Sequence, residues 1–267
     1  MSGEGGRESS TNQEVISLKH VWVQYDGVPV LEDINLILLE QDFLGIIGPN
    51  GGGKTTLLKV LLGLIHPTRG QVRILGRSPE EGRRFIGYVP QYTMLDYDFP
   101  ISVWDVAMMG RLGRRGLLRR YTQEDRDVVA DALRQVDIIE LKDRQIGQLS
   151  GGQRRRVYIA RALASEPKIL LLDEPTASVD SKVLGSIYEL LQELNQRVTI
   201  VLVSHDIGVV STYVKTIACL NQRLIYHASK EITPEMLEAA YQCPVDLIAH
   251  GMPHRVFEHH PGEEVEG

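Results

Sequence analysis

The chain has 267 residues, of which 43% are hydrophobic and 24% are charged. This length suits one large domain or two modest ones, and the composition is that of an ordinary globular protein. The formal net charge of −6 argues against nucleic acid as a partner, because the overall field repels a polyanion.

The sequence carries no signal for a membrane-spanning segment. No apolar run approaches the roughly 18 residues that a spanning helix needs. Residues 1–14 are polar and lack the apolar centre of a signal peptide, so we expect a disordered leader. Cys219 and Cys243 share no short metal or redox spacing, and we interpret them as reduced thiols of a cytosolic protein. A role at a membrane would then need a partner protein.

The first elements that we expect are strands. Residues 15–38 alternate apolar and other residues, which predicts short strands with a turn at Asp26-Gly27. Phe43–Ile47 is a short apolar run that predicts a buried strand. Leu57–Leu62 has the apolar density of a packed helix, with Gly63 as its stop.

Between this strand and this helix lies the pattern G-x-x-x-x-G-K-T, the phosphate-binding loop. Its residues are Gly48, Pro49, Asn50, Gly51, Gly52, Gly53, Lys54 and Thr55, and Thr56 follows them. Glycines let backbone N–H groups turn toward a polyphosphate, and the helix N-terminus adds further donors. Lys54 can reach the β- and γ-phosphates, and the Thr55 hydroxyl can bind Mg²⁺. A glycine-rich turn that binds nothing is the alternative, and the flanking strand and helix argue against it.

The character of the chain changes in its middle. Gln71–Leu75 and Ile86–Val89 predict further strands, and Pro90 stops the second one. From about residue 92 to residue 167 the pattern is mostly helical, and Thr122–Asp125 resembles a capping box. We interpret this block as a helical insert in an α/β core.

A second motif, which is acidic, follows this block. Ile169–Asp173 is an uninterrupted apolar run that ends in a carboxylate, which is typical of a parallel strand covered on both faces. Successive strand side chains diverge, so Asp173 can hold Mg²⁺ while Glu174 orients and deprotonates the attacking water. A solvated acidic turn is the alternative.

Three reactive stretches therefore follow predicted strands. Val198–Val203 predicts another buried strand, with Ser204 and His205 directly after it. Ligands of open parallel sheets bind at the carboxyl ends of strands, so we expect the phosphate loop, Asp173-Glu174 and Ser204-His205 to lie together.

The last part of the chain returns to short elements. Ile217–Leu220 and Leu224–His227 predict a hairpin, and Thr233–Ala240 predicts a final helix with proline at its first position. From Gly251 the tail is polar, and we expect it to be flexible.

A second anion-binding helix start is predicted upstream of the acidic strand. Its sequence is Leu149-Ser150-Gly151-Gly152-Gln153, before a predicted helix over residues 154–164. Three arginines, residues 154–156, would oppose the helix dipole in its first turn. A nearby anion would offset that cost, but for the arginines alone a solvated basic face is the simpler interpretation.

With these motifs the chain resembles the ATP-binding subunits of ABC transporters. Leu149–Gln153 matches the signature sequence of that family, and the resemblance covers about residues 15–232. The supporting matches are Tyr25, Gln91, Ser178-Val179-Asp180 and His205. The resemblance implies an α/β fold with a P-loop NTPase core and a parallel sheet, an antiparallel β subdomain and an inserted helical subdomain. The core would comprise residues 15–91 and 168–232, the helical subdomain about 92–167, and a C-terminal helix with a His/Glu tail 233–267.

The resemblance also implies a role for the motif residues around one ATP. Tyr25 would stack on the adenine, and the loop from Gly48 to Thr56 would cradle the phosphates, with Lys54 on the γ-phosphate. Mg²⁺ would be held by Thr55 and Asp173, with Gln91 sensing the γ-phosphate site and linking it to the membrane partner. Glu174 would be the general base, and His205 would contact the γ-phosphate and position the water.

The remaining motif residues would serve a second subunit. Ser150 and Gly152 would donate to the γ-phosphate bound by the opposite chain, within a binding stretch that includes Gly151 and Gln153. Asp180 would help to couple the two sites. One phosphate loop and one signature in the chain thus imply a homodimer around two ATP molecules.

Two departures from the family pattern are visible. Gly52 stands where alanine or serine is frequent, and Arg155 stands where glutamine is frequent. Neither change removes a group that the chemistry needs.

A narrower resemblance is to the ATPase subunits of bacterial zinc and manganese importers, some of which also carry iron. It rests on Tyr97–Pro100, Met109–Arg111, the segment from Leu220 to Leu237, and His250–His254. Such a subunit would sit on the cytoplasmic face of the inner membrane, bound to a permease that receives metal from an extracytoplasmic binding protein.

Two charged stretches invite further interpretations. The arginines 111, 114, 115, 119 and 120 form a basic stripe that could meet the permease or lipid head groups, although a solvated face is an equal alternative. His254, His259 and His260 lie near tail glutamates and could bind zinc, but their spacing is not a closed structural pattern.

Other functions remain open from the sequence. An ABC importer of another substrate has the same motifs, and so does a non-transport cytosolic ABC ATPase such as an iron–sulfur assembly factor. A nucleotide-binding module without chemistry conflicts with the intact Lys54, Asp173, Glu174 and His205.

Overall fold

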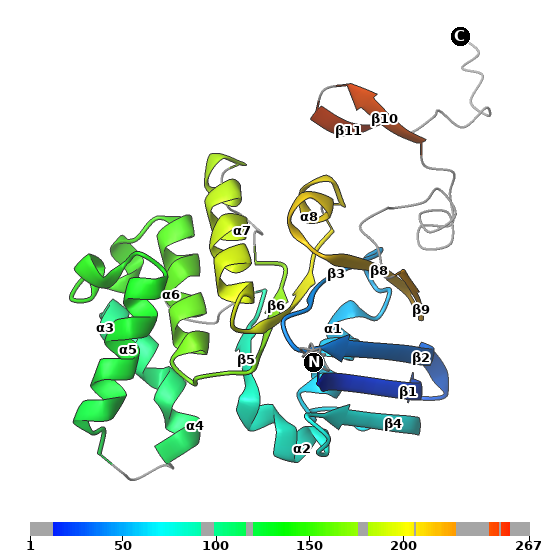
Figure 1. Ribbon diagram of the computed structural model, residues 1–267, viewed down its shortest axis with the longest axis horizontal. Coiled ribbons are helices and arrows are strands. Elements are labelled where there is room, and N and C mark those ends of the chain that lie inside the picture. Colours follow the sequence, from blue (N-terminus) through cyan, green and yellow to red (C-terminus); the bar gives the residue numbers. More distant parts are fainter. Residues whose placement is uncertain are drawn as a thin grey trace, which may run out of the picture.

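We describe the protein from a computed structural model, over residues 13–91, 99–115, 120–175, 181–205, 207–227, 246–250 and 252–256. Two sheets organise the larger part of these residues, and Figure 1 shows them side by side. Of the expected leader, residues 1–12 lie outside the described residues, and Glu14 already begins the first strand.

The larger sheet has six strands in the order β5-β6-β7-β3-β8-β9. They are β5 (Ile86–Val89), β6 (Ile169–Asp173), β7 (Thr199–Val203), β3 (Phe43–Ile47), β8 (Thr216–Asn221) and β9 (Arg223–His227). The first five pair in parallel, and β9 closes one edge antiparallel to β8. The strand predictions for this sheet are confirmed, because buried parallel strands appear in a sequence as continuous apolar runs.

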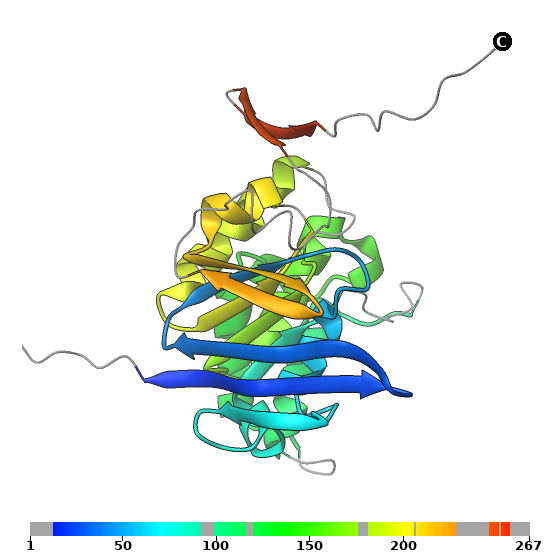
Figure 2. The same ribbon diagram turned by 90° about the vertical axis from the view of Figure 1, so that its right-hand side faces the viewer.

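The smaller sheet is antiparallel and has the order β2-β1-β4, as Figure 2 shows. It consists of β1 (Glu14–Tyr25), β2 (Val28–Leu39) and β4 (Arg69–Ile74). The turn at Asp26-Gly27 is confirmed, but the prediction of short strands is wrong, since β1 and β2 have 12 residues each. His20 and Asp33 adopt φ angles of 51° and 50° inside the strands. Such irregularities interrupt the alternation, so a continuous strand resembles several short ones.

Alternate side chains of β6 enter two separate cores. Leu170 and Leu172 pack with the helices, whereas Ile169 and Leu171 pack with the antiparallel sheet and with α1 (Lys54–Leu61). Figure 1 shows helices α3, α5 and α6 on one side of the six-stranded sheet and the antiparallel sheet on the other. Burial on both faces holds the strand ends that carry the polar residues in fixed positions.

The middle of the chain is helical, as predicted. Its elements are α3 (Val103–Met108), α4 (Leu112–Arg115), α5 (Gln123–Gln135) and α6 (Gly151–Leu163), with 3-10 turns at Met109–Arg111, Ile139–Leu141 and Ile146–Gln148. The Thr122 side chain accepts from the Asp125 N–H, and the Asp125 side chain accepts from the Thr122 N–H. The predicted capping box is therefore confirmed.

The remaining helices flank the sheets. They are α2 (Pro79–Gly82), the 3-10 turn at Arg83–Phe85, α7 (Ser181–Asn195) and α8 (Ile207–Tyr213). Gly63 adopts a φ of 64° directly after Leu62, the C-cap of α1, and the Leu64 N–H donates to the Lys59 carbonyl at 2.9 Å. Gly63 thus ends the helix as predicted.

Arg111 does not belong to an exposed basic stripe, and that interpretation is wrong for it. Its side chain is buried, and its Nε and Nη1 donate to Asp125 at 2.9 Å and Glu166 at 2.7 Å. Arg111 therefore joins the start of α5 to the end of α6. Arg114 lies 3.3 Å from Glu166 as well, Arg120 is exposed, and Arg119 lies outside the described residues.

The C-terminal region contains an element that the sequence did not predict. β10 (Asp246–His250) and β11 (Met252–Val256) pair antiparallel, so residues 252–256 of the tail form the second strand of a hairpin. The helix predicted over residues 233–240 and the histidines 259 and 260 lie outside the described residues. In the part of the chain that the structure describes, no helix is long and apolar enough to cross a membrane, and no cluster of three metal-ligating side chains occurs.

Candidate functional site

Four parallel strands of the larger sheet have their carboxyl ends side by side. Because β3, β5, β6 and β7 run parallel, the residues that follow them emerge on the same side of the sheet. These residues are Gly48, Gln91, Glu174 and His205. The structure thus brings together the three reactive stretches that the sequence analysis expected at this edge.

The phosphate loop is shaped by close backbone approaches. Gly53 is the N-cap of α1 with a φ of 95°, and a Cβ there would lie 2.7 Å from Leu31 Cδ2. At Gly48 a Cβ would lie 2.0 Å from the carbonyl oxygen of Leu220. These positions accept glycine alone, so the loop can wrap tightly around the start of α1.

Lys54 is the first residue of α1 and is buried. Its Nζ donates to the carbonyl oxygens of Gly48 at 3.0 Å and Pro49 at 2.8 Å. Burial lowers the pKa of Lys54, while the Glu174 and Asp173 carboxylates oppose that shift. Negative charge in the loop favours the ammonium form of such a lysine, which fits a polyphosphate ligand.

Thr55 and Asp173 place two oxygen ligands beside each other. Thr55 Oγ1 donates to Asp173 Oδ2 at 3.3 Å, and Asp173 is only 4% exposed. Burial raises the pKa of the Asp173 carboxyl, and the Thr55 hydrogen bond partly offsets this. Mg²⁺ prefers oxygen ligands, including one or two carboxylates next to phosphates. This pair of side chains therefore fits the magnesium ion that the sequence predicts.

Glu174 is held by two other predicted residues. Its Oε2 accepts from Gln91 Nε2 at 2.5 Å and lies 3.5 Å from His205 Nδ1. Glu174 adopts a φ of 44°, and its N–H donates to the Val203 carbonyl at 2.9 Å. A left-handed backbone costs a non-glycine residue about 1–3 kcal/mol, and such residues cluster at functional sites.

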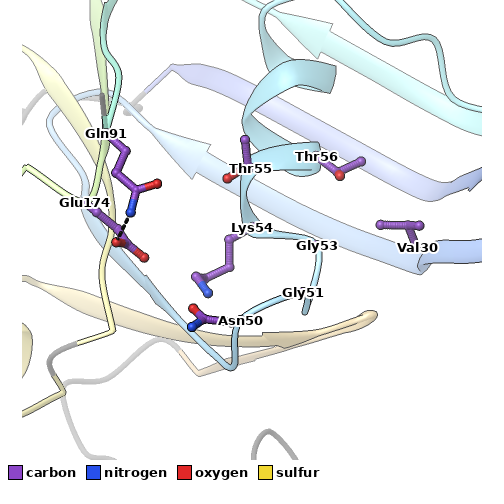
Figure 3. A pocket seen from close by; sticks show the side chains of 9 residues that line it. All are labelled: Val30, Asn50, Gly51, Gly53, Lys54, Thr55, Thr56, Gln91 and Glu174. Atoms are coloured by element: carbon purple, nitrogen blue, oxygen red, sulfur yellow. Dashed lines mark hydrogen bonds between the residues drawn. The ribbon is translucent and has the colours of Figure 1, made fainter. Parts of the chain in front are cut away.

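Lys54, Thr55, Gln91 and Glu174 face a pocket of about 210 Å³, whose described lining includes neither Asp173 nor His205. It is lined by Val30, Asn50, Gly51, Gly53, Lys54, Thr55, Thr56, Gln91 and Glu174. Figure 3 shows Gln91 and Glu174 together on one side of Lys54, with Thr55 and Thr56 at the start of α1 on the other.

The other predicted anion site is the N-terminus of α6. Ser150 Oγ accepts from the Gln153 N–H at 3.3 Å, and Gln153 Oε1 accepts from the Ser150 N–H at 3.0 Å. The helix begins at Gly151, so Gly151 and Gly152 lie inside it and not before it as predicted. Ser150–Gln153 are not among the described residues that line the pocket.

The comparisons with known proteins agree with these motifs. The family model described as ABC transporter matches residues 31–177, which include the phosphate loop, the α6 cap and Glu174. The chain belongs to the ABC transporter family.

Individual members of the ABC transporter family match most of the chain. The manganese transport system ATP-binding protein MntB of Bacillus subtilis is 42% identical over 229 residues, which are 85% of this chain and 92% of that protein. The zinc uptake system ATP-binding protein ZurA of Listeria innocua is 38% identical over 221 residues, 81% of this chain and 86% of that protein.

Solved structures of ABC transporter proteins share the fold. One is described as a metal-chelate type ABC transporter in an inward-facing conformation, with a TM-score of 0.80, 30% identity, and coverage of 91% of this chain and 97% of that one. Another is an ATP-binding cassette in a dimeric, post-hydrolysis state with ADP and phosphate, with a TM-score of 0.69, 30% identity, and coverage of 82% and 100%. The predicted ABC ATPase fold is confirmed, and the chain is an ATP-hydrolysing subunit of this family.

Tyr25, which the family resemblance names, is not among the described residues that line the pocket. Tyr25 ends β1, opposite Val28, and is 47% exposed, so its ring is accessible to a flat ligand. Asp180 lies outside the described residues. Both assignments stay predictions.

Sequence reasoning missed Arg155 as a residue of the site. A solvated basic face was the simpler interpretation of the arginines in α6, but Arg155 is 6% exposed and donates to the Glu174 carbonyl at 2.7 Å. A signal was present, because Tyr158, Ile159 and Ala162 follow Arg155 at helical spacing and are buried as well. With the helix start placed at Gly151, that spacing points Arg155 inward.

Proposed function

We propose that this chain is the ATPase subunit of an importer of divalent metal ions, with manganese or zinc as cargo and iron as a further candidate. The Glu174 carboxylate, held by Gln91 and His205 beside the phosphate loop, is the observation that carries the hydrolytic part of the proposal. The cargo is supported by relatives that are named manganese and zinc transport ATP-binding proteins.

The residues of the pocket fit MgATP. Lys54 contacts the γ-phosphate in place of the carbonyls of its own loop, and the loop N–H groups cradle the phosphates. Thr55 and Asp173 would hold Mg²⁺, with Gln91 at the border of the same pocket. When bound, this ion neutralises charge on the β- and γ-phosphates.

Glu174 is the proposed general base. Its Oε2 accepts the proton of the attacking water, which the Gln91 amide and the His205 ring orient from either side. The water then stands in line with the leaving β–γ bridging oxygen, as phosphoryl transfer requires. The short Gln91–Glu174 contact and the His205–Glu174 contact support this arrangement.

The proposed active form is a head-to-tail homodimer with two ATP molecules. Ser150 and Gly152 at the start of α6 contact the γ-phosphate bound by the partner chain, and Asp180 helps to couple the two sites. The separation of Ser150–Gln153 from the described pocket of its own chain supports this arrangement. So does the similarity to an ATP-binding cassette solved as a dimer with ADP and phosphate.

The proposed membrane partner is a separate permease. The dimer would bind it at the cytoplasmic face of the inner membrane, while an extracytoplasmic binding protein delivers the metal. Closure of the dimer on ATP and its opening after hydrolysis would drive the permease. The metal would cross the permease without contact to this chain.

Metal uptake in living cells tests the proposal. Cells starved of metal would carry either the native chain or Glu174→Gln at equal abundance, with no redundant importer. The matched control is Glu189→Gln, which makes the same chemical change on an exposed face of α7. Uptake of zinc, manganese and iron is then measured separately.

We expect uptake of one of these metals to collapse in Glu174→Gln and to persist in Glu189→Gln. If uptake of all three metals is unchanged, the metal assignment is wrong, and an importer of another substrate or a cytosolic ABC ATPase takes its place. Co-purification with a polytopic membrane protein separates those two outcomes.

A further inference from the structure

Arg155 lies one turn into α6 and faces the six-stranded sheet. Its side chain is 6% exposed, which is rare for an arginine unless the guanidinium is fully engaged. The helix that carries it begins at the Ser150 cap. The buried guanidinium therefore connects this helix with whatever accepts its hydrogen bonds.

The described acceptors include backbone carbonyls from two other segments. Nη1 donates to Pro90 at 3.0 Å, and Nη2 donates to Glu174 at 2.7 Å. Nε donates to Pro175, and Nη2 also lies 3.5 Å from the Asp173 carbonyl. The planar fork of an arginine can reach several acceptors at once, which a point charge on a lysine cannot.

These two segments carry the groups proposed for hydrolysis. Pro90 directly precedes Gln91, whose amide donates to the Glu174 carboxylate. Glu174 itself is in the left-handed region, with a φ of 44°. A strained residue keeps such a conformation only when its surroundings determine it from several sides.

The Glu174 backbone is held on both of its polar groups. Its N–H donates to the Val203 carbonyl at 2.9 Å, and its carbonyl accepts from Arg155 at 2.7 Å. The direction of the side chain follows from this backbone conformation. Loss of the Arg155 hydrogen bonds would leave the Glu174 carbonyl without this donor. It would also release the Pro90 carbonyl, which lies next to Gln91 in the chain.

We propose that Arg155 is a positioning residue for ATP hydrolysis, whose guanidinium fixes the Glu174 and Gln91 segments to the second turn of α6. The inference rests on the proposed role of Glu174 as general base. Because α6 starts at the Ser150 cap, the same bonds connect the helix end proposed to contact the partner's ATP with the carboxylate that acts on the chain's own ATP. Arg155 is not among the described residues that line the pocket, so in this proposal it acts through the backbone that it binds.

The test compares four variants of the full-length chain. Arg155→Gln removes the guanidinium and installs the residue that is frequent in the family, and Arg155→Lys keeps the charge without the fork. Arg156→Gln is the matched control, because Arg156 lies next in the same helix and donates to the Val136 carbonyl, away from the catalytic segments. Glu174→Gln reports on the proposed base itself.

Three quantities are measured for each variant. They are kcat at saturating MgATP, the Kd for MgATP from equilibrium binding, and the Tm. For Arg155→Gln we expect kcat to fall about tenfold or more, the Kd to stay within about twofold, and the protein to remain folded at the assay temperature. Arg155→Lys should recover part of the lost kcat, and Arg156→Gln should keep it.

Each contrary result has a distinct meaning. If Glu174→Gln still hydrolyses ATP at the native rate, the proposed base is wrong and the inference falls with it. If Glu174→Gln is inactive but Arg155→Gln keeps its kcat, the inference alone is overturned. An equal loss of kcat in Arg156→Gln, or a loss in Arg155→Gln that disappears when rates are corrected for the folded fraction, also overturns it.

Discussion

The amide of Gln91 donates to the carboxylate of Glu174 at 2.5 Å, across the ends of the neighbouring strands β5 and β6. The two residues are 83 positions apart in the chain. The helical block lies between them in the sequence. A displacement of that block relative to the sheet would therefore pull on the segments that hold Gln91 and Glu174. The pair therefore connects the predicted catalytic carboxylate with the segment that leads into the helices.

Lys54→Ala should weaken the binding of MgATP. The variant removes an ammonium that lies against the loop carbonyls of Gly48 and Pro49, and charged hydrogen bonds contribute about 1.5–3 kcal/mol. We expect the Kd to rise about tenfold to about a hundredfold, measured by equilibrium titration. Lys59→Ala on the exposed face of the same helix is the control. An unchanged Kd in Lys54→Ala would remove Lys54 from the phosphate site.

Two glycines of the phosphate loop should respond differently to alanine. At Gly48 a Cβ would lie 2.0 Å from the Leu220 carbonyl oxygen, whereas at Gly51 no atom lies within 4 Å of it. We expect Gly48→Ala to lower the free energy of unfolding by more than about 3 kcal/mol, as a severe steric clash does. Gly51 has a φ of 78°, so Gly51→Ala should lower the free energy of unfolding by only about 1–2 kcal/mol, the cost of a left-handed backbone for alanine. Urea denaturation measures both, and equal losses would contradict the packing of this loop against β8.

Asp173→Asn should separate stability from chemistry. Burial raises the pKa of Asp173 above 3.8, so the folded state disfavours the carboxylate. As the pH rises from about 3.8 through the folded pKa, the unfolded chain releases its proton first, and the free energy of unfolding decreases. In the absence of metal we therefore expect the variant to be at least as stable as the native chain at pH 7.

The same variant should lose magnesium-dependent hydrolysis, because the amide is a poorer ligand for a hard cation than a carboxylate. Thermal unfolding with a chelator gives the first quantity, and phosphate release with MgATP gives the second. A marked drop in Tm without metal would show that the Asp173 carboxylate stabilises the fold, against the direction of its pKa shift.

Cys219 should make the stability of the protein fall at high pH. Burial raises the pKa of the thiol from 9.0 to about 11. Between these values the unfolded chain has released the thiol proton and the folded chain has not, so the free energy of unfolding decreases by about 1.4 kcal/mol per pH unit. Cys219→Ala lacks this contribution. Urea denaturation at pH 9 and pH 10 should therefore show a steeper loss for the native chain, and parallel losses would refute the buried thiol.

The helical phase of α6 shows where sequence reasoning reached its limit. The signature stretch predicted a helix, and a helix is present, but its start was placed after the glycines instead of at Gly151. That shift left Arg155 on an expected solvated face. The strand predictions for the six-stranded sheet had no such uncertainty. An apolar run that is buried on both faces can be recognised without deciding which side chains face which way.

The amino-acid sequence by itself determined the chemistry of this protein. Local patterns of residue type, which are visible in the sequence, identify the loop from Gly48 to Thr56, the Asp173-Glu174 pair and the parallel strands before them. The tertiary structure alone decided which polar groups meet. The contacts of Glu174 with Gln91 and His205, and of Arg155 with four carbonyls, join residues far apart in the chain. Their geometry depends on how the sheet and α6 pack, and no local pattern encodes it.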